Sequence, residues 1–155
     1  MTKTNAVRIL DSKNIHYTLN TYDVDEDDLS GITVALKIGA DADSVFKTLV
    51  AEGDKTGHLV FCIPTTEELN LKKAAVVSGN KKVELIKVKD LLNLTGYVRG
   101  GCSPIGMKKK FPTYIDETAL LFELIYVSAG IRGMQVRVSP AELAPLIEAS
   151  FCDLI

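Results

Sequence analysis

The sequence lacks several residue types on which common folds and active sites depend. It contains no Trp, three Cys and two His in 155 residues. The cysteines, Cys62, Cys102 and Cys152, are odd in number and widely spaced, which excludes a disulfide scaffold and favours a reduced, cytoplasmic protein. Because His16 and His58 are the only histidines, no zinc-ligand spacing can be drawn. We therefore expect neither a metal nor a cofactor.

Long apolar runs are also absent. No run approaches the roughly 20 residues of a membrane span, and the N-terminal residues lack the apolar core of a signal peptide. The composition is 46% apolar and 25% charged, an ordinary globular balance that argues against disorder, collagen and coiled coil. A chain of 155 residues is typical of one domain, and we expect a single domain over residues 1–155.

A formal net charge of −2 hides a strong asymmetry along the chain. Residues 1–71 hold 6 basic and 12 acidic side chains, whereas residues 72–110 hold 10 basic and 2 acidic ones. An asymmetry of this kind indicates a polyanionic partner. The alternative is a solvated, lysine-rich face.

Hydrophobic periodicity and turn residues predict a mixture of helices and strands. Helices are predicted over residues 4–13, 32–38, 69–78 and 90–94, with a last helix from Ser139 to about residue 149. Strands are predicted over residues 17–22, 45–50, 58–63, 111–115 and 134–138. Residues 97–106 are interpreted as a strand end and a Gly/Pro loop, and residues 120–127 are compatible with helix or strand. Neighbouring hairpin strands favour a mixed-sheet α/β or α+β domain over a doubly wound parallel sheet.

The motifs of several enzyme classes are missing. The nearest approach to the Gly-x-Ser-x-Gly elbow of serine hydrolases is the stretch 101–106, where the second glycine comes one residue late. Neither histidine carries a partner motif for a Ser or Cys nucleophile, so a classical triad is disfavoured. The phosphate-binding pattern Gly-x-x-x-x-Gly-Lys-Ser/Thr is absent, and paired carboxylates for glycoside chemistry cannot be identified.

Two features remain as candidates for a site. Residues 100–106, Gly-Gly-Cys-Ser-Pro-Ile-Gly, form a tight, preset backbone that can hold a carbonyl oxygen as it becomes negative. Lys47 lies within the apolar run 45–50, and in a cleft it would bind a phosphate or a developing negative charge. The alternatives are an ordinary turn and an edge-strand lysine that keeps its charge in water.

These two features, with their surroundings, resemble the YbaK/EbsC family of aminoacyl-tRNA deacylases, which is related to the editing domain of bacterial prolyl-tRNA synthetase. The resemblance rests on residues 45–50 (Val-Phe-Lys-Thr-Leu-Val), residues 95–106 followed by the lysines 108–110, and residues 125–133. Each stretch alone would be weak evidence for the family, but the three together form a specific pattern. Family-like spacing extends over nearly the whole chain.

The resemblance implies a mixed α/β (α+β) fold, in which a central mixed, partly barrel-like sheet is flanked by helices. It also implies a cleft for the aminoacylated 3′ end of tRNA. The family's essential lysine matches Lys47, with Thr48 beside it, and its pocket serine, aspartate and N-terminal tyrosine match Ser128, Asp116 and Tyr22. Its Gly-x-x-x-Pro loop matches Gly100, Gly101, Cys102, Ser103 and Pro104.

Cys102 departs from the aliphatic residue common at this loop position in the family. The family uses no nucleophile there, and no base is visible in the sequence that would activate the thiol. We therefore expect the loop to act through its backbone.

The function implied by the resemblance is trans-editing of mischarged Cys-tRNA(Pro), in which the substrate's own thiol attacks the ester and a thiolactone leaves. A transient complex with prolyl-tRNA synthetase is implied as well. The alternatives are a deacylase that uses water on another mischarged tRNA such as Ala-tRNA(Pro), a non-catalytic tRNA- or synthetase-binding module, and a broad esterase. Diffuse attraction to the tRNA backbone is expected from Lys72, Lys73, Lys81, Lys82, Lys108, Lys109 and Lys110.

Overall fold

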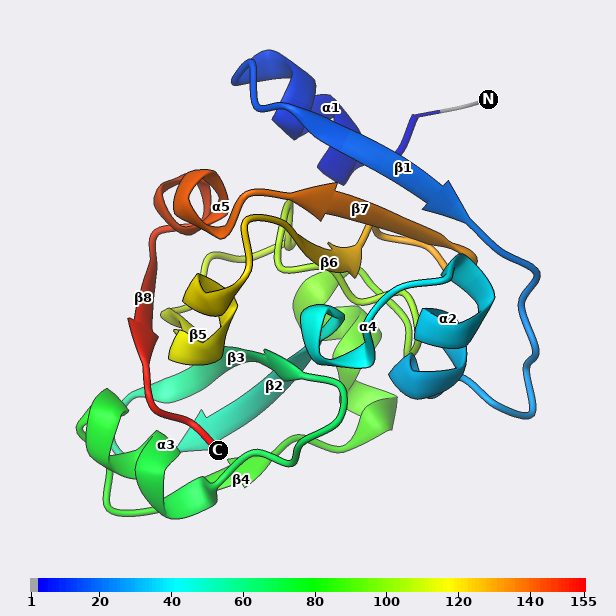
Figure 1. Cartoon of the computed structure of the whole chain (residues 1–155). Coiled ribbons are helices and arrows are strands. Elements are labelled where there is room, and N and C mark those ends of the chain that lie inside the picture. The colour runs from blue at the N-terminus through cyan, green and yellow to red at the C-terminus, as the bar shows by residue number, and fades with distance from the viewer. Residues whose placement is uncertain (1–2) are drawn as a thin grey trace.

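The computed structural model describes residues 3–155, which form helices and two β-sheets (Figure 1). The helices are α1 (Asn5–Ser12), α2 (Gly31–Ile38), α3 (Leu71–Ser78), α4 (Val88–Thr95) and α5 (Pro140–Leu146), with 3₁₀ turns η1 (Ala42–Ser44) and η2 (Glu117–Leu121). The strands are β1 (Tyr17–Thr21), β2 (Phe46–Gly53), β3 (Gly57–Pro64), β4 (Val83–Leu85), β5 (Thr113–Asp116), β6 (Ile125–Ser128), β7 (Met134–Val138) and β8 (Ala149–Cys152). The predicted mixture of helices and strands is confirmed.

Local caps set the ends of the first three helices. Thr4 caps α1 by accepting a hydrogen bond from the backbone three residues on, and Asn70 caps α3 in the same manner. Gly39 ends α2 and Gly79 ends α3 in the left-handed conformation, which glycine adopts without steric strain. These caps lie where the sequence predicts helix ends.

The smaller sheet is antiparallel, with strand order β1-β7-β6. Asn20, Gln135 and Ser128 lie opposite one another across its three strands, so their side chains point from the same face. The neighbouring pair Val136 and Val127 points from the other face and is fully buried. One face of this sheet therefore forms core, and the other carries a polar row.

The larger sheet has strand order β4-β2-β3-β5-β8 and mixes antiparallel with parallel pairs. β2 and β3 form the predicted hairpin, and β5 runs parallel to both β3 and β8. β4 pairs with residues 51–53 alone, so among the described residues the outer edge of β2 has no partner strand over residues 46–49. A single parallel bridge between Val45 and Tyr126 connects the start of β2 to the smaller sheet.

The main core lies between the two sheets. Leu10 of α1, Val136 of β7 and Leu143 of α5 are fully buried in it. A second cluster, on the far side of the hairpin, packs Phe61 with α3 and with Leu154 near the C-terminus. Figure 1 shows α1 beside β1 and β7 at one end of the molecule and α3 at the other. Because β3 contributes to both clusters, it is buried on both faces, which explains its continuous apolar run.

Two expectations from the sequence need correction, and one strand is not expected from it. Residues 97–106 form a loop without a strand. The last helix ends at Leu146, because Pro145 lies in its final turn and Glu148, with φ of 52°, turns the chain into β8. The sequence does not predict β4, since a three-residue strand is too short to show alternation. The ambiguous residues 120–127 divide between η2 and β6.

Within residues 3–155, no helix combines the length and the apolar character needed to cross a membrane.

Candidate functional site

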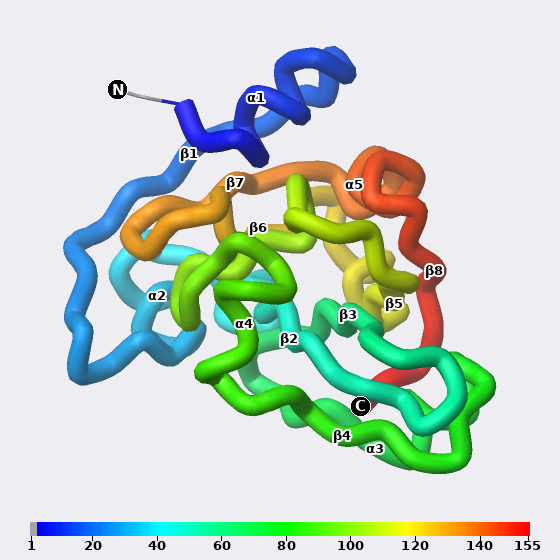
Figure 2. Tube along the Cα trace, turned by 180° about the vertical axis from the view of Figure 1, so that it is seen from behind, coloured from blue at the N-terminus to red at the C-terminus, as the bar shows by residue number. Residues whose placement is uncertain are grey.

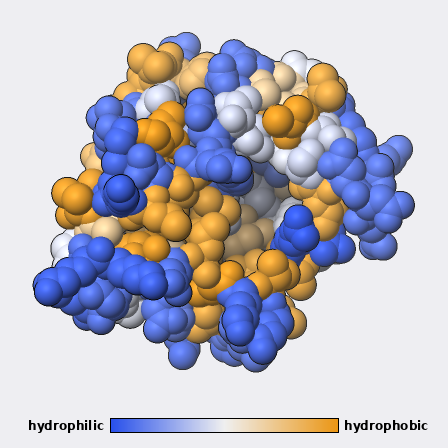
Figure 3. Space-filling model, turned by 90° about the horizontal axis from the view of Figure 1, so that it is seen from below, coloured by the Kyte–Doolittle hydropathy of each residue, from blue (hydrophilic) through white to orange (hydrophobic). Residues whose placement is uncertain are grey.

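A cleft of about 420 Å³ lies where the open edge of β2 meets α2 and the loop after α4. Its wall contains Lys47 and Thr48 of β2, Gly100 and Cys102 of the loop, and Ser128 of β6. Figure 2 shows, from behind, how α4 and the chain around it lie beside β2. Seen from below, the molecule is hollowed next to a broad apolar surface (Figure 3). The structure thus brings together five predicted site residues from three separate parts of the sequence.

The wall of the cleft carries cationic side chains and no anionic ones. Lys47 and Arg99 are its charged residues, and no carboxylate lines it within residues 3–155. Its margin includes exposed apolar side chains, Ile32 from α2 and Leu85 and Val88 from the segment that joins β4 to α4. A positive cleft with an apolar margin fits a ligand that combines negative or carbonyl oxygens with flat apolar groups.

The loop after α4 is held against the turn between β6 and β7. Gly100 has φ of 83°, a left-handed conformation that favours glycine. A Cβ atom on Gly101 would lie 3.0 Å from the backbone nitrogen of Arg132 and 3.1 Å from Ile131 Cα, so a larger residue would push the loop away. Arg132 Nε donates a hydrogen bond of 2.8 Å to the carbonyl oxygen of Arg99. The close packing of Gly101 and the hydrogen bond from Arg132 therefore fix the position of the loop.

Two backbone donors of this loop remain free. The N–H of Gly101 bonds within the loop, whereas the N–H groups of Gly100 and Cys102 have no acceptor among residues 3–155. Both of these residues line the cleft. Ser103 and Pro104 are buried behind the wall, and Ser103 Oγ accepts a hydrogen bond of 3.2 Å from the backbone two residues on. Free N–H groups at a fixed bend can stabilise an oxyanion.

The thiol of Cys102 is poorly suited to be a nucleophile. Burial raises its pKa to about 12, so the neutral thiol predominates near neutral pH. No histidine lines the cleft within the part of the chain that the structure describes. A base that would take the thiol proton is therefore missing from the wall.

Two predicted substrate-binding residues lie outside the cleft. Tyr22 lines a small adjoining recess that shares Gly100 with the cleft. Asp116 is fully buried in β5, where its carboxylate accepts hydrogen bonds from Thr118 N at 3.1 Å and from Leu154 N at 2.9 Å. Because these bonds use the Asp116 carboxylate to hold the C-terminal segment, its placement indicates a structural role.

The seven lysines predicted to contact tRNA are spread over the surface, and none lines the cleft among residues 3–155. Three form ion pairs with nearby carboxylates, namely Lys73, Lys82 and Lys110. The other four are exposed, namely Lys72, Lys81, Lys108 and Lys109. Their positions allow diffuse attraction to a polyanion and no direct part in the cleft chemistry.

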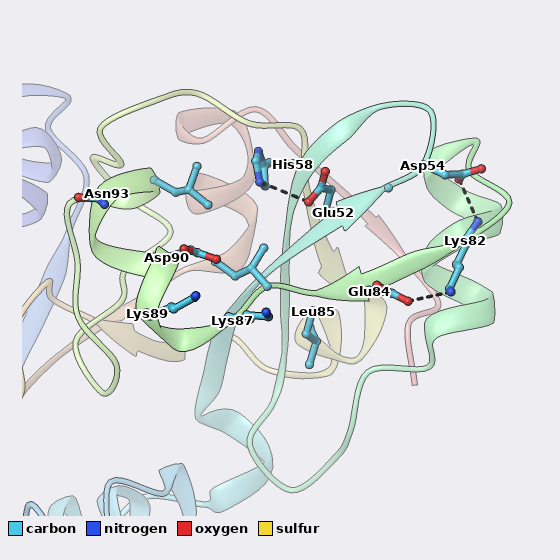
Figure 4. A pocket seen from close by; sticks show the side chains of 13 residues that line it. Glu52, Asp54, His58, Lys82, Glu84, Leu85, Lys87, Lys89, Asp90 and Asn93 are labelled. Carbon is cyan, nitrogen blue, oxygen red and sulfur yellow. Dashed lines mark hydrogen bonds and ion pairs between the residues drawn. The ribbon is translucent and has the colours of Figure 1, made fainter.

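A larger hollow, of about 780 Å³, lies between the hairpin and α4. Figure 4 shows acidic and basic side chains mixed along its wall. Lys82 pairs with Glu84 at 2.8 Å, and His58 Nε2 lies 3.9 Å from Glu52 Oε2. Because four carboxylates accompany the three lysines of this wall, the hollow lacks the single sign of charge that the cleft has, and we assign the site to the smaller cleft.

Four polar residues of the cleft are not identified from the sequence, namely Ser30, Thr65, Arg99 and Gln135. Arg99 directly precedes the predicted loop, so a search of the flanking positions would have found it. Gln135 lies in the otherwise apolar start of β7 and is 6% exposed. A long polar side chain inside an apolar strand is the signal that points to it.

Comparison with known proteins agrees with this geometry. The sequence model of the aminoacyl-tRNA editing domain family matches residues 32–146. These residues include Lys47 and the loop after α4. The chain is also 48% identical over 152 residues to EbsC of Enterococcus faecalis, a provisionally assigned Cys-tRNA(Pro)/Cys-tRNA(Cys) deacylase, with 98% of this chain and 93% of that protein covered. The chain therefore belongs to the aminoacyl-tRNA editing domain family. The resemblance to YbaK/EbsC and the prediction of an aminoacyl-tRNA deacylase are confirmed.

Solved structures support the same fold. A protein provisionally described as a trans-editing enzyme for prolyl-tRNA synthetase superposes with a TM-score of 0.84 at 25% identity, covering 99% of this chain and 98% of that one. The hypothetical protein APE2540 superposes with a TM-score of 0.87 at 21% identity, covering 97% and 99%. At that identity the second match shows the fold alone.

Proposed function

We propose that this protein is a trans-editing deacylase that cleaves the ester of mischarged Cys-tRNA(Pro). The observation that carries the proposal is the positive cleft, which is lined by Lys47 and by Gly100 and Cys102, whose N–H groups have no acceptor among residues 3–155. No histidine lines this cleft in the described chain. An aminoacyl ester is already reactive, so position and electrostatics suffice for its cleavage. The assigned substrates of EbsC support the choice of cysteine.

In the proposed reaction the substrate supplies its own nucleophile. The cysteine sulfur of the substrate attacks the ester carbonyl carbon, and the N–H groups of Gly100 and Cys102 stabilise the oxyanion. The ester C–O bond then breaks, the ribose oxygen takes the thiol proton, and a cyclic thiolactone leaves with free tRNA. Lys47 neutralises charge at the terminal adenosine or its phosphate, while Thr48 and Ser128 orient the aminoacyl group or the ribose.

The proposal includes a transient complex with prolyl-tRNA synthetase, which would supply the choice of tRNA. The description of the similar solved structure as a trans-editing enzyme for that synthetase supports it. Because aminoacyl-tRNA is made and used in the cytoplasm, we place the protein there. The four exposed lysines would add attraction to the tRNA backbone that weakens with salt.

A deacylation panel tests the function directly. Cys-, Ala-, Ser- and Pro-tRNA(Pro) are each incubated with substoichiometric protein, with and without the synthetase. We expect Cys-tRNA(Pro) to be cleaved fastest and the thiolactone to be detected. A preference for Ala-tRNA(Pro) would reassign the protein to water-dependent cleavage, and no turnover of any substrate would reduce it to a binding module.

Replacing Lys47 gives the most direct test of the site. Replacing it with Ala removes a positive charge from the wall that also carries the free loop donors, and we expect kcat/KM to fall about 100-fold or more. The melting temperature should change little, because the side chain is partly exposed. Lys13→Ala, on an exposed lysine outside the cleft and outside the predicted tRNA-binding lysines, is the matched control and should retain activity. Full activity in Lys47→Ala would exclude the role of this lysine.

A further inference from the structure

The wall of the cleft contains a buried polar side chain without a partner. Gln135 lines the cleft and is 6% exposed. Its Oε1 atom is shielded from solvent and has no hydrogen-bond partner within residues 3–155. Such an oxygen destabilises the folded protein until a donor reaches it. An unsatisfied acceptor in a binding site therefore points to a group of the ligand.

Gln135 also supplies a side-chain carbonyl oxygen, which the other residues of the wall lack, since no Asp, Glu or Asn lines the cleft in the described chain. Lys47 and Arg99 can only donate. Ser128, directly opposite Gln135 in the sheet, already accepts a hydrogen bond of 3.1 Å from Gly130 N. The hydroxyls of Ser30, Thr48 and Thr65 in the wall can accept as well as donate. Gln135 adds the one amide carbonyl oxygen among its side chains.

We propose that Gln135 Oε1 accepts a hydrogen bond from the α-amino group of the aminoacyl substrate. The proposal rests on the proposed function and adds to it the group by which the cleft recognises an amino acid. An amino group that leaves water requires an acceptor. The terminal torsion of a glutamine side chain is soft, so the amide can turn its oxygen towards the ligand.

This contact has a consequence for substrate choice. Holding the α-amino group at Gln135 directs the neighbouring ester carbonyl towards the loop donors at Gly100 and Cys102. Esters whose amino group is missing or blocked cannot make the contact. The cleft is therefore expected to favour free aminoacyl esters over desamino and N-acylated ones.

Asn20 offers a competing, purely structural explanation. It lies opposite Gln135 on β1, and its Nδ2 atom is also buried without a partner in the described residues. A small rotation of both amides would allow Asn20 to donate to Gln135. Asn20 does not line the cleft. A structural pair therefore predicts equal effects of changes at either residue, whereas recognition predicts an effect at Gln135 that depends on the substrate's amino group.

A cycle that pairs enzyme variants with substrate variants separates the two explanations. The substrates are Cys-tRNA(Pro) and 3-mercaptopropionyl-tRNA(Pro), which keeps the thiol and the ester and lacks only the α-amino group. Each rate is divided by the uncatalysed rate of the same ester. We expect the wild type to prefer the aminoacyl ester about tenfold, Gln135→Met to show almost no preference, and Gln135→Glu, which keeps an acceptor, to retain one. Asn20→Leu is the control and should keep the wild-type preference.

The outcomes decide the proposal. Equal preference in the wild type and Gln135→Met would overturn it, and so would an equal loss in Asn20→Leu. Melting temperatures of all variants show whether they are folded.

A binding measurement decides the same question without turnover. Cysteinyl-3′-amino-3′-deoxyadenosine, whose amide link resists cleavage, is titrated against its desamino counterpart. We expect about tenfold tighter binding of the amino compound by the wild type and equal binding by Gln135→Met. No difference in the wild type would overturn the role of Gln135. Failure of the proposed function would instead appear as no deacylation of Cys-tRNA(Pro).

Discussion

Lys47 and Cys102 share one cleft, but their surroundings assign them different tasks. Lys47 stands in a wall without carboxylates, so its charge is available to an anionic or carbonyl oxygen of a ligand. Burial keeps Cys102 neutral by raising its pKa to about 12. At the scale of single residues, the wall of the cleft therefore carries positive charge and backbone donors, and its one thiol is not an activated nucleophile.

Replacing Cys102 tests this division. We expect Cys102→Ala to retain deacylation within about threefold of the wild type, because a neutral, buried thiol contributes little as a nucleophile. Alkylation of Cys102 in the folded protein should be slow below pH 9 for the same reason. Steady-state kinetics and mass spectrometry after iodoacetamide treatment measure the two effects. Complete loss of activity with an unchanged melting temperature would instead indicate thiol chemistry by the enzyme.

The loop after α4 depends on an element far along the chain. Its Gly101 backbone packs against the backbone of the turn between β6 and β7, and Arg132 of that turn binds the Arg99 carbonyl oxygen. The direction of the free donors at Gly100 and Cys102 is set by this contact between two loops. Element packing, and not the loop sequence alone, therefore fixes the shape of the proposed oxyanion site.

We expect Gly101→Ala to lower kcat at least tenfold. A Cβ atom 3.0 Å from the nitrogen of Arg132 forces the loop to shift, and donors that move by a few tenths of an ångström stabilise an oxyanion less well. Gly79→Ala is the matched control. Gly79 has φ of 75° with open space around it, so its substitution costs about 1 kcal/mol of stability and should leave kcat unchanged. Equal kcat in the two variants would contradict the loop contact.

At the scale of the whole molecule, the buried thiol of Cys62 is expected to make the protein less stable at alkaline pH. Cys62 is fully buried in the core, and burial raises the pKa of its thiol to about 12, whereas an exposed thiol titrates near about 8.5. The unfolded chain loses this proton first as the pH rises. Above pH ~8.5 the native state therefore binds more protons, and the free energy of unfolding falls until the pH reaches the folded pKa.

We expect the free energy of unfolding to drop by roughly 1–2 kcal/mol through Cys62 between pH 8 and pH 10. Urea unfolding at the two pH values measures the drop. In Cys62→Ala the stability at pH 8 should be lower because of the cavity, but the decrease between pH 8 and pH 10 should be smaller. The same decrease in both proteins would show that this thiol does not titrate as expected.

The sequence by itself determined the mixed α/β class, the first three helices and the β2–β3 hairpin, because caps, turns and alternation are local patterns. It also predicted Lys47 and the loop at Gly100 as candidate site residues, because each lies in a short motif of neighbouring residues. Only the tertiary structure showed that Asp116 binds the backbone of the C-terminal segment and that β8 replaces the end of the last helix. It alone placed Gln135 in the cleft opposite Ser128. Burial and cross-strand partners come from residues distant in the chain, and local patterns carry no record of them.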